Sequence, residues 1–180
     1  MFICIRGEEF DFARKVGMGL VSCAIELSEI ILKEKDSIDR LIFVGSAGSY
    51  SKDIPIFSVL ESKYALQIES SYLLNNSYTP IAGLENVSHE TKKQIIVNSS
   101  NYITRDESVS SLMHNRGIAL ENMEFFSILN VAKYFNIPAH GIFCITNYCN
   151  ANAHEEFLLN HSKAREILET YVKDNYEKYF

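Results

Sequence analysis

Several features are scarce in this 180-residue sequence, and each scarcity argues against one class of protein. No apolar run approaches the roughly 20 residues that cross a bilayer, so we expect no membrane partner. The first ten residues contain acids where a signal peptide needs a longer apolar core, so we expect a cytoplasmic protein. Positive charge is scarce too, with 17 basic against 23 acidic residues, and a net charge of −6 argues against a nucleic-acid partner.

The sequence has only four cysteines, and three of them lie in apolar segments, where a thiol behaves as a small hydrophobic side chain. We expect reduced thiols. Cys144, Cys149 and His154 are close in sequence but lack the four-ligand pattern of a structural zinc site, so we expect no metal. The other histidines have no repeated spacing or paired acid, and we interpret them as surface or internally satisfied residues: His89, His114, His140 and His161.

The patterns that are present predict a single α/β domain over residues 1–180. Hydrophobic and charged fractions of 47% and 22% are ordinary for a globular protein, and no repeat or linker divides the chain. Short apolar segments predict strands at 2–5, 41–44, 94–97, 118–120 and 139–145, with one or two more within 56–68. Helical spacing predicts helices over 12–35, 104–114, 125–135 and 153–176, the second one capped by Thr104 with Glu107 three residues later.

Polar residues follow three of these strands and suggest a site at one edge of the sheet. Ser46 and Gly48 lie in a small-residue turn after strand 41–44, where N–H and hydroxyl groups can hold an anion. Glu124 follows strand 118–120, and Asn147 follows strand 139–145. Ligands of α/β sheets gather at the carboxyl ends of strands, so these side chains are candidates for one site. The ordinary alternatives are an acid that favours a helix start and an amide that favours a turn.

Several short motifs in one order add a resemblance to a known family. They are Val16-Gly17-Met18-Gly19, Val44-Gly45-Ser46-Ala47-Gly48, Asn122-Met123-Glu124 and Ile145-Thr146-Asn147, with Ser100-Asn101-Tyr102-Ile103 as a looser match. With these motifs taken together, the chain resembles the purine nucleoside phosphorylase and methylthioadenosine nucleosidase superfamily across residues 14–160. The resemblance implies a three-layer αβα sandwich around a twisted mixed sheet and a homodimer or an assembly of dimers. It also implies cleavage of a purine N-glycosidic bond without a cofactor.

The same resemblance implies roles for individual residues. Glu124 would bind the ribose hydroxyls and stabilise the cation-like sugar that forms as the bond breaks. Met123 would pack beneath the ribose and Tyr102 would stack on the base, while Ser46 and Gly48 would hold phosphate or the water in its place. Asn122 belongs to the substrate-binding signature, where relatives have a glutamate.

Asn147 stands where relatives that accept 6-aminopurines have an aspartate. An amide cannot deliver a proton at neutral pH, but it can donate a hydrogen bond to N7 or O6 of the base. We therefore expect a preference for 6-oxopurine nucleosides such as inosine or guanosine.

Two departures from the family pattern leave the reaction type open. Phosphorolytic relatives have an arginine where this chain has Phe43, and the early phosphate loop is abbreviated, which leaves Arg6, Arg14 or a neighbouring subunit to contact phosphate. Hydrolytic relatives place a water-activating glutamate after the first strand, and Glu8 is the candidate here, although Glu8 and Glu9 could form an ordinary solvated turn. The amide at the base position favours phosphorolysis, with inorganic phosphate as co-substrate and ribose 1-phosphate as product. Hydrolysis is the alternative, and a non-catalytic nucleoside-binding relative is the second alternative.

Overall fold

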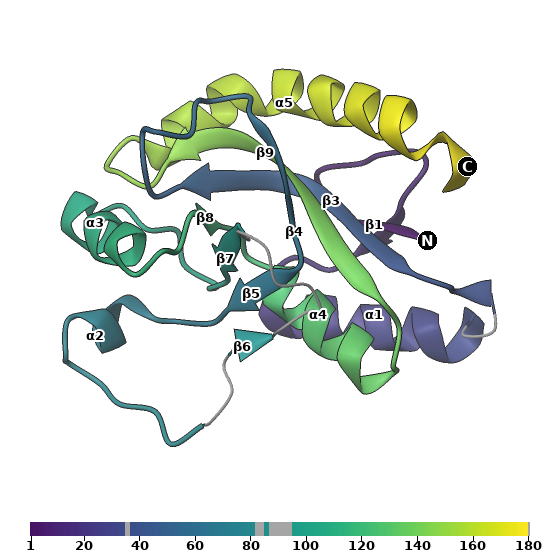
Figure 1. Cartoon of the computed structure of the whole chain (residues 1–180), viewed down its shortest axis with the longest axis horizontal. Helices are drawn as coiled ribbons and strands as arrows, with labels where there is room; N and C mark the ends of the chain where they lie inside the picture. Colours follow the sequence, from purple (N-terminus) through teal and green to yellow (C-terminus); the bar gives the residue numbers. More distant parts are fainter. Residues whose placement is uncertain (35–36, 82–84, 87–94, 180) are drawn as a thin grey trace.

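A computed structural model describes residues 1–34, 37–81, 85–86 and 95–179, and it shows a three-layer αβα sandwich (Figure 1). Helix α5 (Ala153–Tyr176) covers one face of the central sheet, and helices α1 (Leu20–Glu34) and α4 (Phe125–Tyr134) cover the other. Each interface has its own apolar core, because the central strands are buried on both faces. The predicted fold class is therefore confirmed.

The sheet is mixed and contains nine strands within the described ranges. Its long central pair is β3 (Leu41–Ser49) and β9 (Ala139–Tyr148), which run parallel. Strand β8 (Leu120–Glu121) pairs antiparallel with the end of β3, and β4 (Val59–Ser62) pairs antiparallel with β9. The remaining strands complete the two sides of the sheet: β1 (Phe2–Ile5), β2 (Arg14–Val16), β5 (Tyr64–Leu66), β6 (Glu85–Asn86) and β7 (Ile96–Asn98).

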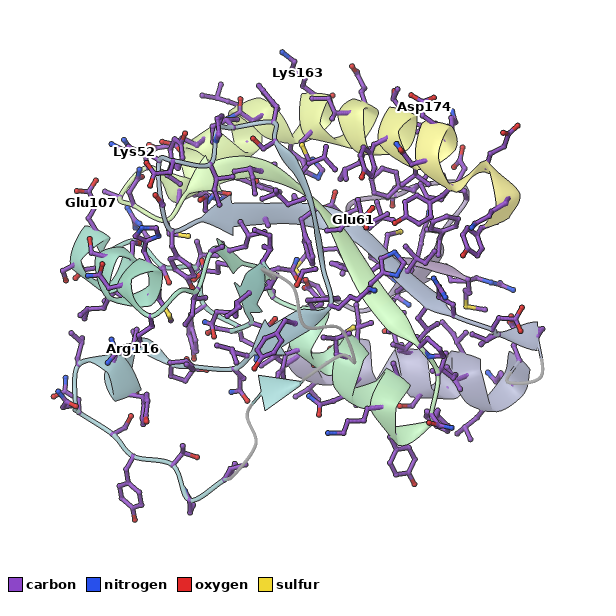
Figure 2. All side chains as sticks on the ribbon, in the orientation of Figure 1. Lys52, Glu61, Glu107, Arg116, Lys163 and Asp174 are labelled. Carbon is purple, nitrogen blue, oxygen red and sulfur yellow. The ribbon has the colours of Figure 1, made fainter. Side chains whose placement is uncertain are left out.

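Two shorter helices and a terminal turn lie outside the two main helical layers. Helix α2 (Ser70–Leu73) and helix α3 (Glu107–Asn115) pack beside the β7 and β8 end of the sheet, where they share a third apolar cluster. A 3₁₀ turn (Glu177–Tyr179) extends α5. Figure 2 shows Lys163 and Asp174 on the solvent side of α5, as the alternation of buried and exposed positions along this amphipathic helix requires.

Some predicted elements are confirmed and others need correction. Strand 2–5 and helix 153–176 have the predicted bounds. The helix predicted over 12–35 begins only at Leu20, because residues 14–16 pair with β1 as the parallel strand β2. The small-residue segment 45–49 is not a turn but the second half of β3, held by hydrogen bonds to both β8 and β9.

The predicted cap of the helix at 104–114 is also wrong. Thr104 donates its backbone N–H and its hydroxyl to Glu121, so it is not available as a cap. Asp106 caps α3 instead, because its side chain accepts from the N–H of Ser108 at 2.7 Å. Positions 35, 89 and 94, over which predictions extended, lie outside the described residues.

Within those described ranges, no helix combines the length and apolar character needed to cross a membrane.

Candidate active site

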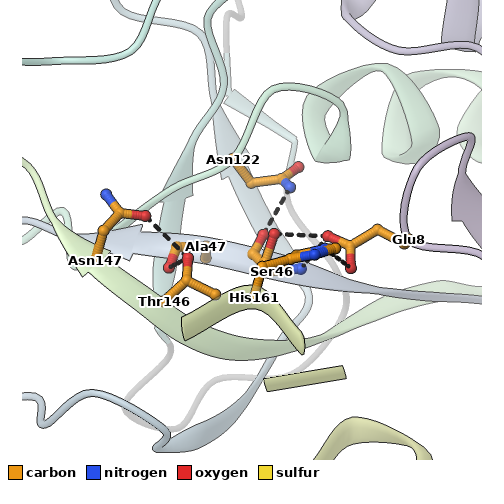
Figure 3. A network of polar contacts seen from close by, with 7 residues as sticks. All are labelled: Glu8, Ser46, Ala47, Asn122, Thr146, Asn147 and His161. Atoms are coloured by element: carbon orange, nitrogen blue, oxygen red, sulfur yellow. Dashed lines mark hydrogen bonds and ion pairs between the residues drawn. The ribbon is translucent and has the colours of Figure 1, made fainter. Parts of the chain in front are cut away.

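Polar side chains gather where β3, β8 and β9 run side by side (Figure 3). The pairing of β3 with β9 shifts at Ala47 and Gly48, whose partners are Ile145 and Asn147, so Thr146 is an extra residue. Such a bulge changes the direction of the following side chain. It therefore determines how Asn147 is presented at the end of β9.

Glu8 is buried at one end of this network, in the turn after β1, with 3% of its surface exposed. Gly7 precedes it with a φ of 111°, a backbone conformation that favours glycine and directs Glu8 inward. Oε1 of Glu8 accepts the backbone N–H of Ser46 at 2.9 Å and the Ser46 hydroxyl at 2.6 Å. Oε2 lies 3.1 Å from Nε2 of His161.

These contacts decide the charge of Glu8. Burial by itself would raise the pKa of the carboxyl group, but the hydrogen bonds from His161 and Ser46, with the charge of His161, hold its pKa below the usual value. Glu8 is therefore ionised at neutral pH, although it is almost completely removed from solvent.

Glu124 is a second buried carboxyl group, with 1% of its surface exposed. It occupies the residue before α4, but its side chain does not cap that helix. Instead Oε1 accepts the backbone N–H of Gly19 at 2.8 Å. Burial raises the pKa of Glu124 to about 7, and the nearby charge of Glu8 contributes to the increase. The two carboxyl groups thus differ in pKa: Glu8 is ionised at neutral pH, and Glu124 is about half ionised near pH 7.

Asn122 connects Glu124 to the central strand. Its Oδ1 accepts the backbone N–H groups of Glu124 and Phe125, both at 2.9 Å, which satisfies the start of α4. Its Nδ2 donates to the carbonyl oxygen of Ser46 at 3.1 Å. The amide therefore fixes the segment carrying Glu124 against the strand that contacts Glu8.

Asn147 lies at the other end of the network, with 7% of its surface exposed. Its Oδ1 accepts the Thr146 hydroxyl at 2.9 Å, while Nδ2 makes only a longer contact of 3.3 Å with the carbonyl oxygen of Tyr148. Gly48 allows this approach, because a Cβ there would lie 2.9 Å from Nδ2 of Asn147. The amide thus has its acceptor engaged and keeps donor capacity on Nδ2.

Other predicted site residues lie at the border of the network or away from it. Met123, between Asn122 and Glu124, is half-buried. Tyr102 is 78% exposed and borders a pocket of about 260 Å³ between α2 and α3, which Glu8, Glu124 and Asn147 do not line. Stacking of Tyr102 on the base therefore stays a prediction.

Both predicted phosphate-binding arginines are engaged on the surface. Arg6 makes two hydrogen bonds to the Glu26 carboxylate, at 2.7 and 2.5 Å. Arg14 contacts both oxygens of the Glu34 carboxylate at 3.1 and 3.0 Å. Each guanidinium is thus held against α1 by an exposed ion pair and not directed at Ser46.

Sequence reasoning missed two polar residues. His161 was expected to lack a paired acid, but it pairs with Glu8 across 153 positions of sequence, a separation that no local pattern reveals. Glu121 is buried and accepts the Tyr50 hydroxyl at 2.8 Å as well as both Thr104 donors, so it fixes the segment after Tyr102 to β8. Glu9, by contrast, is exposed as a turn residue would be.

The cysteines are all buried and free. Burial raises the pKa of Cys144 to about 12, so this thiol is protonated and packs as an apolar side chain. Among the residues that the structure describes, no three His, Cys, Asp or Glu side chains are grouped to hold a metal ion.

Comparison with known proteins identifies the family of this chain. The sequence profile of the phosphorylase superfamily matches residues 2–174. No curated protein sequence matches the chain.

Several solved structures share the fold at low sequence identity. A mutant of the Helicobacter pylori 5′-methylthioadenosine/S-adenosylhomocysteine nucleosidase, with 5′-methylthioadenosine in its active site, has a TM-score of 0.76 at 16% identity, and the match covers 96% of each chain. Futalosine hydrolase of Helicobacter pylori gives 0.76 at 15% identity, also over 96% of each chain. The S. pneumoniae 5′-methylthioadenosine/S-adenosylhomocysteine nucleosidase, bound to a transition-state inhibitor, gives 0.69 at 15% identity over 94% of this chain and 96% of that one.

Because the profile match spans nearly the whole sequence and the fold agrees with these structures along the chain, this protein belongs to the phosphorylase superfamily.

Proposed function

We propose that this protein hydrolyses the N-glycosidic bond of purine nucleosides and releases the free base and ribose. One observation carries the proposal. The Glu8 carboxylate accepts both hydrogen bonds that Ser46 can donate, and these are the groups that the family resemblance assigns to phosphate or to the water in its place. An ionised carboxylate at that position repels a second anion, whereas it attracts and polarises a water molecule.

The alternative of phosphorolysis, which the sequence favoured, has less support. Phosphate needs a cation or several free donors, and the two candidate arginines are paired with Glu26 and Glu34. The solved relatives reported above are, by their titles, nucleosidases and a hydrolase, which also favours hydrolysis.

Glu8 and Glu124 have separate parts in the proposed reaction. Glu8 takes a proton from water as the water oxygen bonds to C1′ of the sugar. The bond from C1′ to the purine nitrogen breaks, and its electron pair leaves with the base, which takes a proton from solvent. Glu124 binds the ribose hydroxyls and stabilises the positive charge that develops on the sugar. Glu8 then returns its proton to solvent.

Asn147 sets the preference for the base. Its Oδ1 accepts the Thr146 hydroxyl, so Nδ2 would be the group that donates to the departing purine. A donor suits O6 and N7 of a 6-oxopurine, which are both acceptors, whereas the amino group of a 6-aminopurine is itself a donor. Inosine and guanosine type nucleosides are therefore the favoured substrates.

The test is base release from purified protein in phosphate-free buffer. Inosine, guanosine and adenosine, each with and without a 5′-methylthio group, are incubated with and without added phosphate. The proposal expects free ribose, no dependence on phosphate and faster turnover of 6-oxopurines. Product that forms only with phosphate would support phosphorolysis, and tight nucleoside binding without product would support the non-catalytic alternative.

A further inference from the structure

His161 contacts the proposed general base directly, although the family resemblance gives it no role. Its Nε2 lies 3.1 Å from Oε2 of Glu8, and the two side chains are 24% and 4% exposed. The ring is held at this place by α5, and it packs against Phe157 with a centroid distance of 4.8 Å. Figure 3 shows His161 reaching the Glu8 carboxylate from the helix beside the sheet.

The hydrogen bonds to Glu8 leave room for one more donor. A carboxylate offers about four lone-pair directions, and Ser46 uses two of them on Oε1 while His161 uses one on Oε2. The remaining direction on Oε2 can receive a water hydrogen. With both oxygens held, the carboxylate cannot rotate, so the direction offered to water is fixed.

The next residue along the helix holds the other end of the network. Nδ2 of Asn160 donates to the carbonyl oxygen of Thr146 at 2.8 Å, immediately before Asn147. Two adjacent residues of α5 therefore fix the Glu8 end and the Asn147 end against one another. Helix α5 thus covers the sheet and also holds both ends of the polar network.

We infer that His161 is a positioning residue for hydrolysis: it holds Glu8 in the orientation and the charge state that a general base requires. The inference rests on the proposed function. Electrostatics agree with it, because the hydrogen bond and charge of Glu8 raise the pKa of His161 while those of His161 lower the pKa of Glu8. Glu8 and His161 are therefore both charged at pH values between the lowered pKa of Glu8 and the raised pKa of His161.

Other titratable groups face the pair from four elements: Cys4 on β1, Cys144 on β9, Glu124 before α4 and Arg165 on α5. The charge of Glu8 raises the pKa of Glu124 because like charges repel, and Arg165 opposes protonation of His161. Removing His161 would leave the buried Glu8 with only the Ser46 hydrogen bonds, and the pKa of Glu8 would rise.

The experiment measures kcat/KM for inosine hydrolysis against pH in the full chain. His161→Gln keeps an N–H donor but loses the positive charge, and His161→Phe loses both while keeping a ring beside Phe157. We expect the acidic limb of the profile to move to higher pH, by about one unit for the Phe variant and by less for the Gln variant. KM should change by less than about threefold, because His161 contacts the base catalyst and not the nucleoside. His114→Gln, an exposed change on α3, is the matched control.

A second measurement does not depend on activity. The NMR titration of His161 is compared in the wild type and in Glu8→Gln, and we expect its pKa to fall when the carboxylate charge is removed. An active wild type whose His161 variants keep the same pH profile would overturn the inference and leave the proposed function standing. An unchanged His161 titration in Glu8→Gln would overturn it too. If the wild type hydrolyses no nucleoside, the proposed function fails and the positioning role fails with it, even where the two groups titrate as a pair.

Discussion

The Glu8 carboxylate binds the backbone N–H and the hydroxyl of Ser46 through a single oxygen, at 2.9 and 2.6 Å. The Glu8 carboxylate therefore occupies the two Ser46 hydrogen-bond donors that an anionic substrate such as phosphate would otherwise use. It also buries a charge, which is tolerated only because hydrogen bonds and a partner charge compensate for lost hydration. The hydrolysis proposed for this protein depends on that arrangement.

Replacing the carboxylate should stop the reaction without preventing substrate binding. Glu8→Gln keeps the size of the side chain but cannot take a proton from water, so we expect kcat to fall by about 10²- to 10⁴-fold. KM should change little, because Glu8 contacts the water and not the nucleoside. Glu9→Gln is the control, since Glu9 is the exposed neighbour in the same turn. Equal activity of the two variants in a base-release assay would contradict the role of Glu8.

Glu124→Gln should also remove activity, because an amide stabilises a cation-like sugar far less well than a carboxylate. We expect a fall in kcat/KM of at least about 10²-fold, measured with inosine, from the loss of this electrostatic stabilisation. The surface change Glu155→Gln in α5 should have no such effect. Retained activity in Glu124→Gln would remove the central carboxylate from the mechanism.

The same substitution should stabilise the fold at neutral and alkaline pH. The pKa of Glu124 is about 7 in the folded protein against 4.5 as its ordinary value, so between these values the folded state binds more protons than the unfolded state. Wild-type stability should therefore decline, relative to Glu124→Gln, as pH rises from 4.5 to 7. At 1.36 kcal/mol per pKa unit the difference above pH 7 is at most about 3 kcal/mol. Urea unfolding at pH 4.5 and pH 8 measures it, and a pH-independent difference would show that this pKa is not raised.

Asn147→Asp should shift base preference toward 6-aminopurines. A carboxyl group can accept from the amino group of adenine or, when protonated, donate to N7. We expect the ratio of kcat/KM for adenosine to that for inosine to rise by about tenfold or more, in proportion to roughly 1.4 kcal/mol of differential binding. Asn150→Asp makes the same chemical change three residues away and should leave the ratio unaltered. A ratio that stays constant in Asn147→Asp would mean that this amide does not read the base.

Gly48→Ala tests the packing that presents Asn147. The new Cβ would lie 2.9 Å from Nδ2 of Asn147 and 3.0 Å from the Cys149 sulfur, so one or both side chains must move. We expect a loss of about 1–3 kcal/mol in unfolding free energy. We also expect kcat to fall by a larger fraction than the unfolding free energy does. Thermal unfolding and kinetics on inosine measure both effects. Full activity with unchanged stability would show that the Asn147 amide does not need this close approach.

The sequence predicted the layers of the fold because those layers depend on local patterns. The 3.6-residue apolar spacing of residues 153–176 and the continuous apolar run into β9 both reflect burial, and both elements formed, although β9 continues to Tyr148, three residues beyond the predicted strand 139–145. The errors arose where pairing between distant segments decides the structure. Residues 14–16 extend the sheet beside β1, and residues 45–49 extend β3, although glycine and serine favour turns when considered locally.

The site was predictable to the extent that motif order carries information. Ser46, Asn122, Glu124 and Asn147 were all named from short motifs, and the structure places their segments around the end of β3. His161 could not be found in this way, because its partner is in the first turn of the chain and α5 brings them together only after folding. Glu121 was not predicted for a similar reason, because its hydrogen bonds with Tyr50 and Thr104 bring together residues that are distant in sequence.

The most direct test of hydrolysis follows the oxygen atom that reaches the sugar. The wild-type protein is incubated with inosine and excess phosphate in ¹⁸O-labelled water, and the ribose product is analysed by mass spectrometry. Water activated by Glu8 would place one ¹⁸O atom on C1 of free ribose, even when phosphate is abundant. Accumulation of unlabelled ribose 1-phosphate would contradict this account, because phosphate would then have displaced the Glu8 carboxylate from Ser46.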